Sequence, residues 1–549
     1  MPNPVVHQET YFFFPFVIDK EVVASAHGDF WPPLRSWIDG LDEWIRSENC
    51  ATASPIRTKL GGWRRASYER FDLESPAYQD MVFFHPFVRR VFFDTKTGGQ
   101  DTLIRVYEIT APEGGPVLWH AEDLRKRSCT VAVKDLRLFL FANGVGILSI
   151  GVERSDCSVR EALWMNEMMR KVYPTSGRQR REGRIPSYSR LVHEGDILAE
   201  ETFESGAIVQ FQPPLSKLVQ SLLYFLNYDA NEYEQIFDER MIPYTYVTIA
   251  RDFGEGEKIQ MLLSRLLYVD RDGEGYRYDP AFTREQMKEH CYTRWAHEGT
   301  YYGFTRYSNV TLAYEQGTRG LHLASEGDLI QRMFQGRYYL MAIVALFYRV
   351  TLLDFAENVA LVSRRLYHDL ELGTLQHQNM GIATDLRSDF LNFCNYWHFD
   401  ELANKDEEIE HFMMQCKAYR VEELRAQVEQ EIEKMNAAIN EYNQFRSTEA
   451  VNRLAMLSTI FGAGAVITGF FGMNFGSEFA RYLFNPDGGT HHIHDAAVWS
   501  VSIIALTIVF LGVWLVATNW NDYRGILRLR GSRRYRLHRW FSLRSGGNH

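Results

Sequence analysis

The sequence predicts an α/β (α+β) cytoplasmic domain, followed by a long stalk helix and two C-terminal transmembrane helices. Strand-like runs rich in aromatic and β-branched residues occupy the first half of the chain. A long polar stretch without Gly or Pro follows, and two uncharged apolar runs lie near the C-terminus. The chain has 549 residues, 24% of them charged, and its mean hydropathy is -0.29. The two apolar runs therefore stand out from a composition that is otherwise typical of a water-soluble protein.

Residues 1–324 are predicted to form an enlarged cytoplasmic α/β domain. Its strand-like runs are bounded by turn signals, and Asn143-Gly144 between two apolar runs is typical of a β-hairpin. The runs that we expect to be strands are 10–18, 80–94, 102–110, 129–153 and 244–250.

Residues 325–400 are predicted to form a cytoplasmic helical region. Helical patterns cover 326–372 and, less regularly, 385–394. The apolar run 340–348 is too short to cross a bilayer, and Arg349 follows it directly. We therefore expect a buried core helix there.

Residues 401–453 are predicted to form a stalk helix, because the stretch is rich in Glu, Ala, Gln, Lys and Arg. Nothing before residue 454 breaks the pattern, so one helix of about 75 residues, roughly 110 Å long, would continue into the first apolar run. Apolar residues recur at three- to five-residue steps along it, which predicts packing against copies of the same helix. An ordinary intramolecular core helix is the alternative.

The two apolar runs, 454–471 and 497–518, contain 18 and 22 residues without a charge. Each is close to the roughly 20 residues that a helix needs to cross the hydrocarbon layer. We expect transmembrane helices at 454–475 and 497–518; a pair of buried helices in a soluble core is the alternative.

Flanking charges predict the orientation of the two helices. The tail, residues 519–549, contains eight arginines after Asp522 and no further acid, whereas the loop 476–496 has one arginine and three acids. Positive charge is retained inside, so both termini are expected in the cytoplasm, in a bacterial-type plasma (inner) membrane. The basic tail would also favour anionic lipid headgroups.

The first transmembrane helix is predicted to end in Gly472-Met473-Asn474, and the second follows within about 25 residues. A cytoplasmic domain, a stalk helix, a terminal Gly-Met-Asn, a short loop, a last helix and a basic tail together resemble the CorA family of divalent-cation transporters. The resemblance covers residues 401–544. It implies a homopentameric funnel in which the first transmembrane helices line a pore, with a ring of Asn474 side chains at its outer mouth. Neutral oxygens suit a hydrated Mg²⁺ ion, which gives up its water reluctantly.

The resemblance also implies pore-lining positions, carried over by their offset from the Gly-Met-Asn motif. These are Leu454, Ser458, Gly462 and Ala465. Leu454 would form a hydrophobic constriction, and the small residues would permit close helix approach. The chain lacks the Met and Pro that the family often has near Gly462, and the Thr that it often has at Ala465. Arg453 would repel cations if it faced the lumen; we expect it to face stalk neighbours or lipid headgroups instead.

Two further groups of polar residues could either bind ions or simply be exposed to solvent. The outer loop carries Glu478, where the family often has a Glu, together with His491, His492 and His494. The imidazoles could capture a softer ion or sense pH, or they could simply be solvated. The acidic run 406–410 could contribute to a magnesium sensor, or it could be a solvated helix face.

No P-loop, GxSxG, HExxH or CxxC motif is found, so we expect no enzyme activity. A net charge of -10 without a strongly basic domain argues against a nucleic-acid partner. No tightly bound cofactor is expected, apart from Mg²⁺ or another divalent cation as substrate and possible regulator. The sequence thus predicts passive, potential-driven transport of Mg²⁺, with Co²⁺ or Ni²⁺ also carried. The alternatives are a zinc transporter of the same family and a membrane-anchored signalling protein without conduction.

Overall fold

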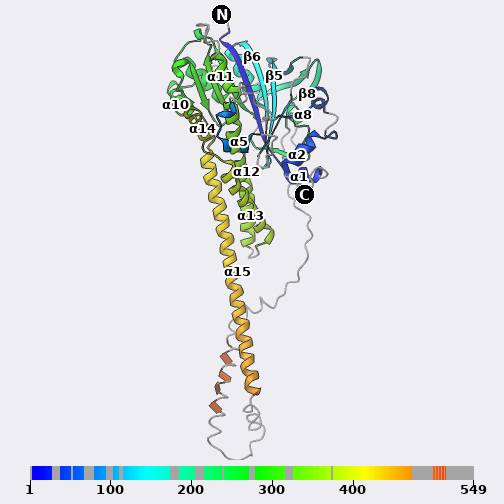
Figure 1. Cartoon of the computed structure of the whole chain (residues 1–549), viewed down its shortest axis with the longest axis vertical. Coiled ribbons are helices and arrows are strands. Elements are labelled where there is room, and N and C mark those ends of the chain that lie inside the picture. The colour runs from blue at the N-terminus through cyan, green and yellow to red at the C-terminus, as the bar shows by residue number, and fades with distance from the viewer. Residues whose placement is uncertain are drawn as a thin grey trace, which may run out of the picture. The chain divides into compact units, whose positions relative to one another are not determined.

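The computed structural model describes residues 3–27, 37–50, 54–66, 80–93, 103–109, 115–172, 185–203, 215–237, 240–270, 278–315, 326–371, 375–472, 499–500, 503–504, 506–507, 510–511 and 514. The chain divides into two compact units, Met1–Met435 and Asn436–His549. The first unit holds a mixed α/β domain built on a large sheet (Figure 1).

Thirteen strands form the sheet within the described residues, and its central strand is β1 (Val5–Ile18). The main order is β11-β12-β13-β10-β1-β6-β5-β4-β7-β8; β2 pairs with β3, β3 with β5 and β9 with β1. All pairs are antiparallel except β10 with β13. The other strands are β2 (Arg64–Arg65), β3 (Ile104–Ile109), β4 (Val117–Asp123), β5 (Ser128–Phe141), β6 (Val145–Cys157), β7 (Pro186–His193), β8 (Asp196–Thr202), β9 (Tyr233–Gln235), β10 (Ile242–Ile249), β11 (Cys291–Tyr292), β12 (Thr300–Phe304) and β13 (Asn309–Tyr314).

Both faces of β1 are buried, which explains why its sequence is a continuous aromatic run. Tyr11 and Phe13 belong to the core cluster that contains the long helix α12 (Arg337–Glu371). Phe12 and Phe14 point to the opposite face and belong to a second cluster, because successive strand residues alternate between faces. Several smaller helices pack in this part of the domain: α1 (Lys20–Ala26), α2 (Trp37–Arg46), α3 (Pro55–Leu60), α6 (Val159–Met169) and α8 (Lys217–Leu222).

Most of the expected strands are present, including the hairpin of β5 and β6 around Asn143-Gly144. The expected strand at 80–94 is wrong, because this segment contains the helix α5 (Pro86–Phe92). Pro86 occupies the first helical turn, where its missing N–H costs nothing, and Val88 and Phe92 lie four residues apart on one buried face.

The helical region contains α11 (Glu326–Gln335), α12, α13 (His377–Asn392) and a π-helix, η5 (Phe393–Trp397). Gly336 separates α11 from α12, and a Cβ atom there would lie 1.8 Å from Asp80 Oδ2. Within the described residues, one helical stretch is long and apolar enough to cross a membrane, Leu329–Glu371, and 78% of its apolar window is buried. This burial agrees with the expected core helix.

The prediction of a single, continuous stalk helix is wrong for the first part of the segment. The structure has α14 (Asp406–Tyr419) and α15 (Val421–Gly472), separated by Arg420 in the left-handed conformation with φ 58° and ψ 41°. The Arg420 N–H donates to the carbonyls of Cys416 and Lys417, which closes the last turn of α14. Tyr419 and Val421 on either side are both buried, so packing holds a conformation that costs an arginine roughly 1–2 kcal/mol.

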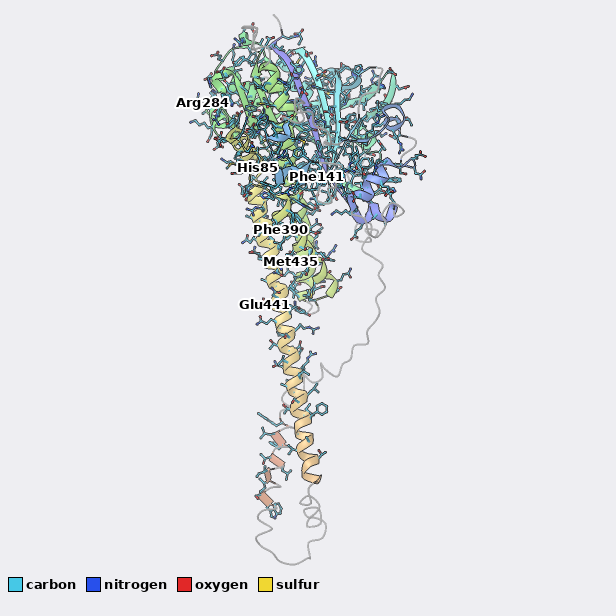
Figure 2. All side chains as sticks on the ribbon, in the orientation of Figure 1. His85, Phe141, Arg284, Phe390, Met435 and Glu441 are labelled. Atoms are coloured by element: carbon cyan, nitrogen blue, oxygen red, sulfur yellow. The ribbon has the colours of Figure 1, made fainter. Side chains whose placement is uncertain are left out.

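The apolar stripe at the start of α15 packs within its own chain. Val421, Val428 and Ile432 belong to the core cluster that contains α12. Met435, labelled in Figure 2, accepts a hydrogen bond from Ser363 Oγ of α12 at 3.8 Å. The intramolecular alternative therefore holds for these four turns, and self-association is not needed to bury them. Among the described residues, the first unit also contains α9 (Glu257–Tyr268) and α10 (Pro280–His290), with short 3-10 turns at Arg251–Phe253 and Ala296–Glu298.

Candidate functional site

The C-terminal part of α15 carries the four positions that the sequence predicts to line a pore. All four, Leu454, Ser458, Gly462 and Ala465, are exposed. Because successive helical residues turn by about 100°, they fall within about 80° of one another around the axis of α15. They therefore form one face of the helix. Around Gly462 there is no atom within 4 Å of the place a Cβ would take, so a partner helix could approach closely at that point.

Large apolar side chains cover the rest of this helical segment and are also exposed. Phe461 is 74% exposed and Leu454 is 66% exposed. The described large apolar residues of the second predicted span are exposed as well: Trp499, Ile503, Ile504, Leu506, Phe510, Leu511 and Trp514. Exposed apolar side chains in this number are typical of a site for lipid or for protein contact.

Arg453 lies off the predicted pore face. Its direction differs by about 100° from that of Leu454 and by about 180° from that of Gly462. Its guanidinium group forms an ion pair with Glu449, one turn earlier on α15, and Arg446 Nη1 lies 3.9 Å from the same carboxylate. The cation beside the predicted inner constriction is thus paired on the opposite side of the helix.

Gly472 is the last residue of α15. The other predicted ion-binding residues lie outside the described residues: Met473, Asn474, Glu478, His491, His492 and His494.

The acidic run at the start of α14 is engaged in contacts with the domain. Glu408 is buried and accepts a hydrogen bond from Arg337 Nη1 at 2.7 Å. Glu407 accepts hydrogen bonds from the hydroxyl of Tyr338 and the indole of Trp295, both at 3.0 Å. These carboxylates anchor α14 to neighbouring elements, so the interpretation as a solvated helix face is wrong for Glu408.

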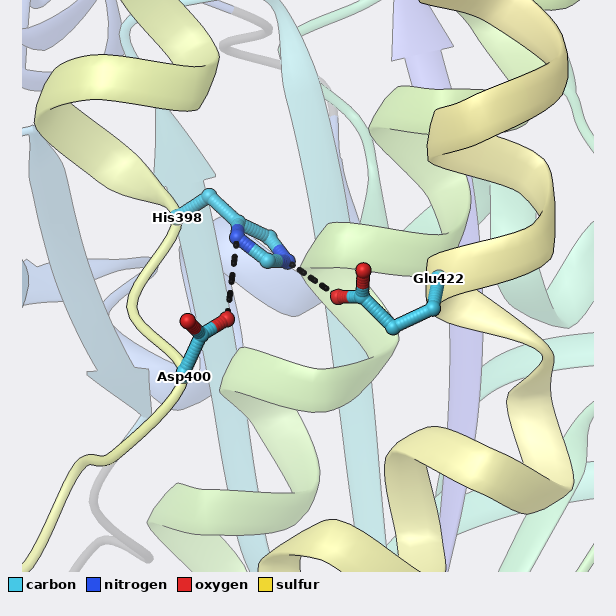
Figure 3. Close-up of side chains that lie close together, drawn as sticks. All are labelled: His398, Asp400 and Glu422. Carbon is cyan, nitrogen blue, oxygen red and sulfur yellow. Dashed lines mark ion pairs between the residues drawn. The ribbon is translucent and has the colours of Figure 1, made fainter.

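His398, Asp400 and Glu422 form a cluster at the start of the stalk that sequence reasoning missed (Figure 3). His398 Nδ1 lies 3.9 Å from Asp400 Oδ1, and His398 Nε2 lies 3.6 Å from Glu422 Oε1. Glu422 also pairs with Arg425, with 2.6 Å between Nη2 and Oε2. The cluster joins the segment before α14 to the first turn of α15. No spacing signal identifies it, because Glu422 lies 22 residues beyond Asp400.

The imidazole of His398 is almost fully buried between its two carboxylates. Burial lowers the pKa of His398, and the negative charges of Glu422 and Asp400 oppose that effect while Arg425 adds to it. Three such groups could hold a metal ion. One ligand atom from each of the three residues lies within 4.8 Å of the other two, and both carboxylates are exposed to solvent.

Comparison with known proteins finds a match to one protein family in the C-terminal part of the chain. Residues 397–518 match the model of the CorA-like Mg²⁺ transporter protein family. This part of the chain is similar to the CorA-like family. No curated protein matches the chain. One solved structure, the complete structure of the CorA magnesium transporter from Methanocaldococcus jannaschii, aligns over 57% of this chain and 96% of that chain, with 13% identity and a TM-score of 0.21.

The CorA-like part contains the His398 cluster, α14, all of α15 and the second apolar run. The large sheet and α12 lie before it in the sequence. The family match therefore covers the predicted transport segment and does not include the large sheet.

Proposed function

We propose that the chain is a divalent-cation transporter whose principal substrate is Mg²⁺. The observation that carries the proposal is the position of Gly472-Met473-Asn474. The tripeptide begins at the last residue of α15 and lies inside the part of the chain that matches the CorA-like family. Such a transporter is not an enzyme, and the divalent cation is its cargo.

The exposed apolar surface supports a membrane location for the C-terminal unit. An apolar helix of this length that its own chain leaves uncovered is stabilised by lipid or by neighbouring helices. We propose that 454–475 and 497–518 span the membrane with both termini in the cytoplasm. Five copies would bring their 454, 458, 462 and 465 faces together around one axis, and anionic headgroups would contact the basic tail.

In this arrangement, Asn474 would contact the hydrated ion at the outer mouth. Carbonyl oxygens without a formal charge bind the waters of Mg²⁺ and release the ion again, because its full dehydration is avoided. The membrane potential would supply the driving force, about 4.6 kcal/mol per 100 mV for a doubly charged ion.

The test is ion flux into proteoliposomes that contain the purified full-length chain. Mg²⁺, Co²⁺, Ni²⁺ and Zn²⁺ would be compared in the wild type and in Asn474→Ala. Asn440→Ala is the matched control, because Asn440 is exposed on the same helix but lies nine turns before the motif. We expect Mg²⁺ flux that falls at least about tenfold in Asn474→Ala and is unchanged in Asn440→Ala.

The other outcomes separate the alternatives. Zn²⁺ flux without Mg²⁺ flux would indicate a zinc transporter. The transport proposal is contradicted if no ion is carried by folded, oligomeric protein from which internal metal has been removed. That outcome would favour a membrane-anchored signalling protein.

A further inference from the structure

A cleft of about 540 Å³ opens in the first unit. It lies where the turn after β12 meets the C-terminal ends of α9, α10 and α14. Its volume falls within the range of about 300–1,000 Å³ that is usual for small-molecule sites. Its wall includes Lys417 in the last turn of α14 and Arg420, the residue between α14 and α15.

The lining of the cleft is strongly cationic. Five arginine or lysine side chains reach it, while Glu289 supplies the single carboxylate among the lining residues. The five are Arg170, Arg240, Arg306, Lys417 and Arg420. Helix C-termini carry about half a negative charge each, so α6, α9, α10 and α14, which all end at this cleft, offset only part of this positive charge. The positive charge that remains favours an anion.

Two of these cations are exposed and have no carboxylate partner. Arg306 and Lys417 make no ion pair within the described part of the chain. Arg420 is paired only loosely, since its Nε lies 3.9 Å from Glu423 Oε1 and both side chains are half exposed. These three side chains come from the turn between β12 and β13 and from the end of α14. They are therefore available to bind one ligand from two sides.

Aromatic rings accompany the charges. Tyr307 and Tyr268 line the same cleft, and 42% of Tyr307 is exposed. The guanidinium carbon of Arg240 lies 5.5 Å from the centre of the Tyr307 ring. Cationic groups next to partly exposed rings match a ligand that combines phosphate with a planar ring.

We propose that this cleft binds a phosphate-bearing anion of about nucleotide size. Occupancy would bring Arg306 of the turn between β12 and β13 onto the same ligand as Lys417 and Arg420 at the end of α14. It would thereby fix the turn from which α15 starts. Any effect of the ligand on transport rests on the proposed function, whereas binding itself does not.

Binding is measured by titration calorimetry on the full-length protein in detergent, with EDTA present so that no divalent cation takes part. The probes are ATP, inorganic tripolyphosphate and adenosine. We expect ATP and tripolyphosphate to bind and adenosine not to bind. Equal affinities for ATP and tripolyphosphate would assign the site to phosphate alone, and tighter ATP binding would show that the rings contribute.

The variant that tests the site is Arg306→Gln with Lys417→Gln. Both side chains are exposed, so the fold should be kept, and we expect affinity to fall at least about tenfold. Arg284→Gln with Lys288→Gln removes the same charge from α10 outside the cleft and should leave affinity unchanged; Arg284 is labelled in Figure 2. The proposal is overturned if neither phosphate compound binds, or if the cleft variant and the control bind equally. Because calorimetry needs no flux, failure here leaves the transport proposal standing, and the converse also holds.

Discussion

Helix α12 and the C-terminal part of α15 have similar apolar composition but opposite surroundings. Ile343 and Phe347 of α12 are almost fully buried, whereas Leu454 and Phe461 of α15 are mostly exposed. Hydropathy therefore measures how much surface must be covered, and the fold decides what covers it. The sheet and neighbouring helices cover α12. Among the described residues nothing covers 454–466 to a similar extent, which agrees with the proposed membrane location of this segment.

The largest effect is expected when one phenylalanine is truncated in each helix. The ring of Phe347 stacks on Phe141 with 4.1 Å between centroids, and Phe347→Ala should lower the free energy of unfolding by about 3–5 kcal/mol. Phe461→Ala removes an exposed ring and should leave the unfolding of the first unit unchanged. Chemical denaturation of the full-length protein in detergent, followed by near-UV circular dichroism, measures both. Equal losses of stability would contradict the comparison.

Glycine positions give a second, smaller contrast. A Cβ atom on Gly146 of β6 would lie 2.2 Å from the ring of Phe16, so Gly146→Ala should cost about 1–3 kcal/mol. Gly462→Ala meets nothing within the chain. Its expected effect is on association: if small residues bring copies of α15 together, the alanine variant should dissociate at lower detergent concentration. Light scattering coupled to size-exclusion chromatography gives the oligomeric state, and an unchanged oligomer would remove Gly462 from the contact.

Burial of a histidine in the first unit predicts that the stability of this unit depends on pH. Burial lowers the pKa of His411, on α14, to about 3. Its ring stacks on Tyr338 with 4.3 Å between centroids. In the unfolded chain the pKa returns to about 6.5, so between these values the unfolded state binds the extra proton. Stability therefore falls as the pH is lowered from about 6.5 toward 3, by up to about 1.4 kcal/mol per pH unit.

Replacement by phenylalanine should remove this component of acid sensitivity. His411→Phe keeps a planar ring among aromatic neighbours, and its free energy of unfolding should depend less steeply on pH between 6.5 and 3 than that of the wild type. The exposed His297→Gln variant serves as control. Identical slopes for His411→Phe and the wild type would show that other groups govern acid unfolding. No ionisable residue occurs in 454–471, so this apolar segment should not contribute to the slope.

The sequence predicted the elements of the fold correctly where apolar patterns are long and uninterrupted. It predicted β1, the hairpin of β5 and β6, and the burial of α12, because burial of apolar residues dominates those elements. It failed at α5, where aromatic residues suggested a strand although Pro86 and the four-residue spacing of Val88 and Phe92 fit a helix. It failed again at Arg420, because the break there has no Gly or Asn signal and depends on packing against the domain.

The candidate sites divide in the same way. The Gly-Met-Asn motif could be read from local sequence, and the pore-lining face is what the family resemblance implies; both remain predictions. The His398 cluster and the cationic cleft could not, because their residues lie far apart in the chain and only the fold brings them together. Arg170 and Arg420, for example, are separated by 250 positions and line one cleft.

The smallest expected effect concerns the two faces of α15 itself. The partly exposed Arg453–Glu449 pair should stabilise the helix by only about 0.3–0.5 kcal/mol. If Arg453 points away from the pore axis as its angular position indicates, Arg453→Gln should change Mg²⁺ flux in proteoliposomes by less than about twofold. Leu454→Lys places a cation one residue further on, within the predicted pore face, and should reduce flux at least about tenfold. A several-fold rise of flux in Arg453→Gln would instead place that arginine in the lumen, and the pore face would then have to be rotated by about 100° around α15.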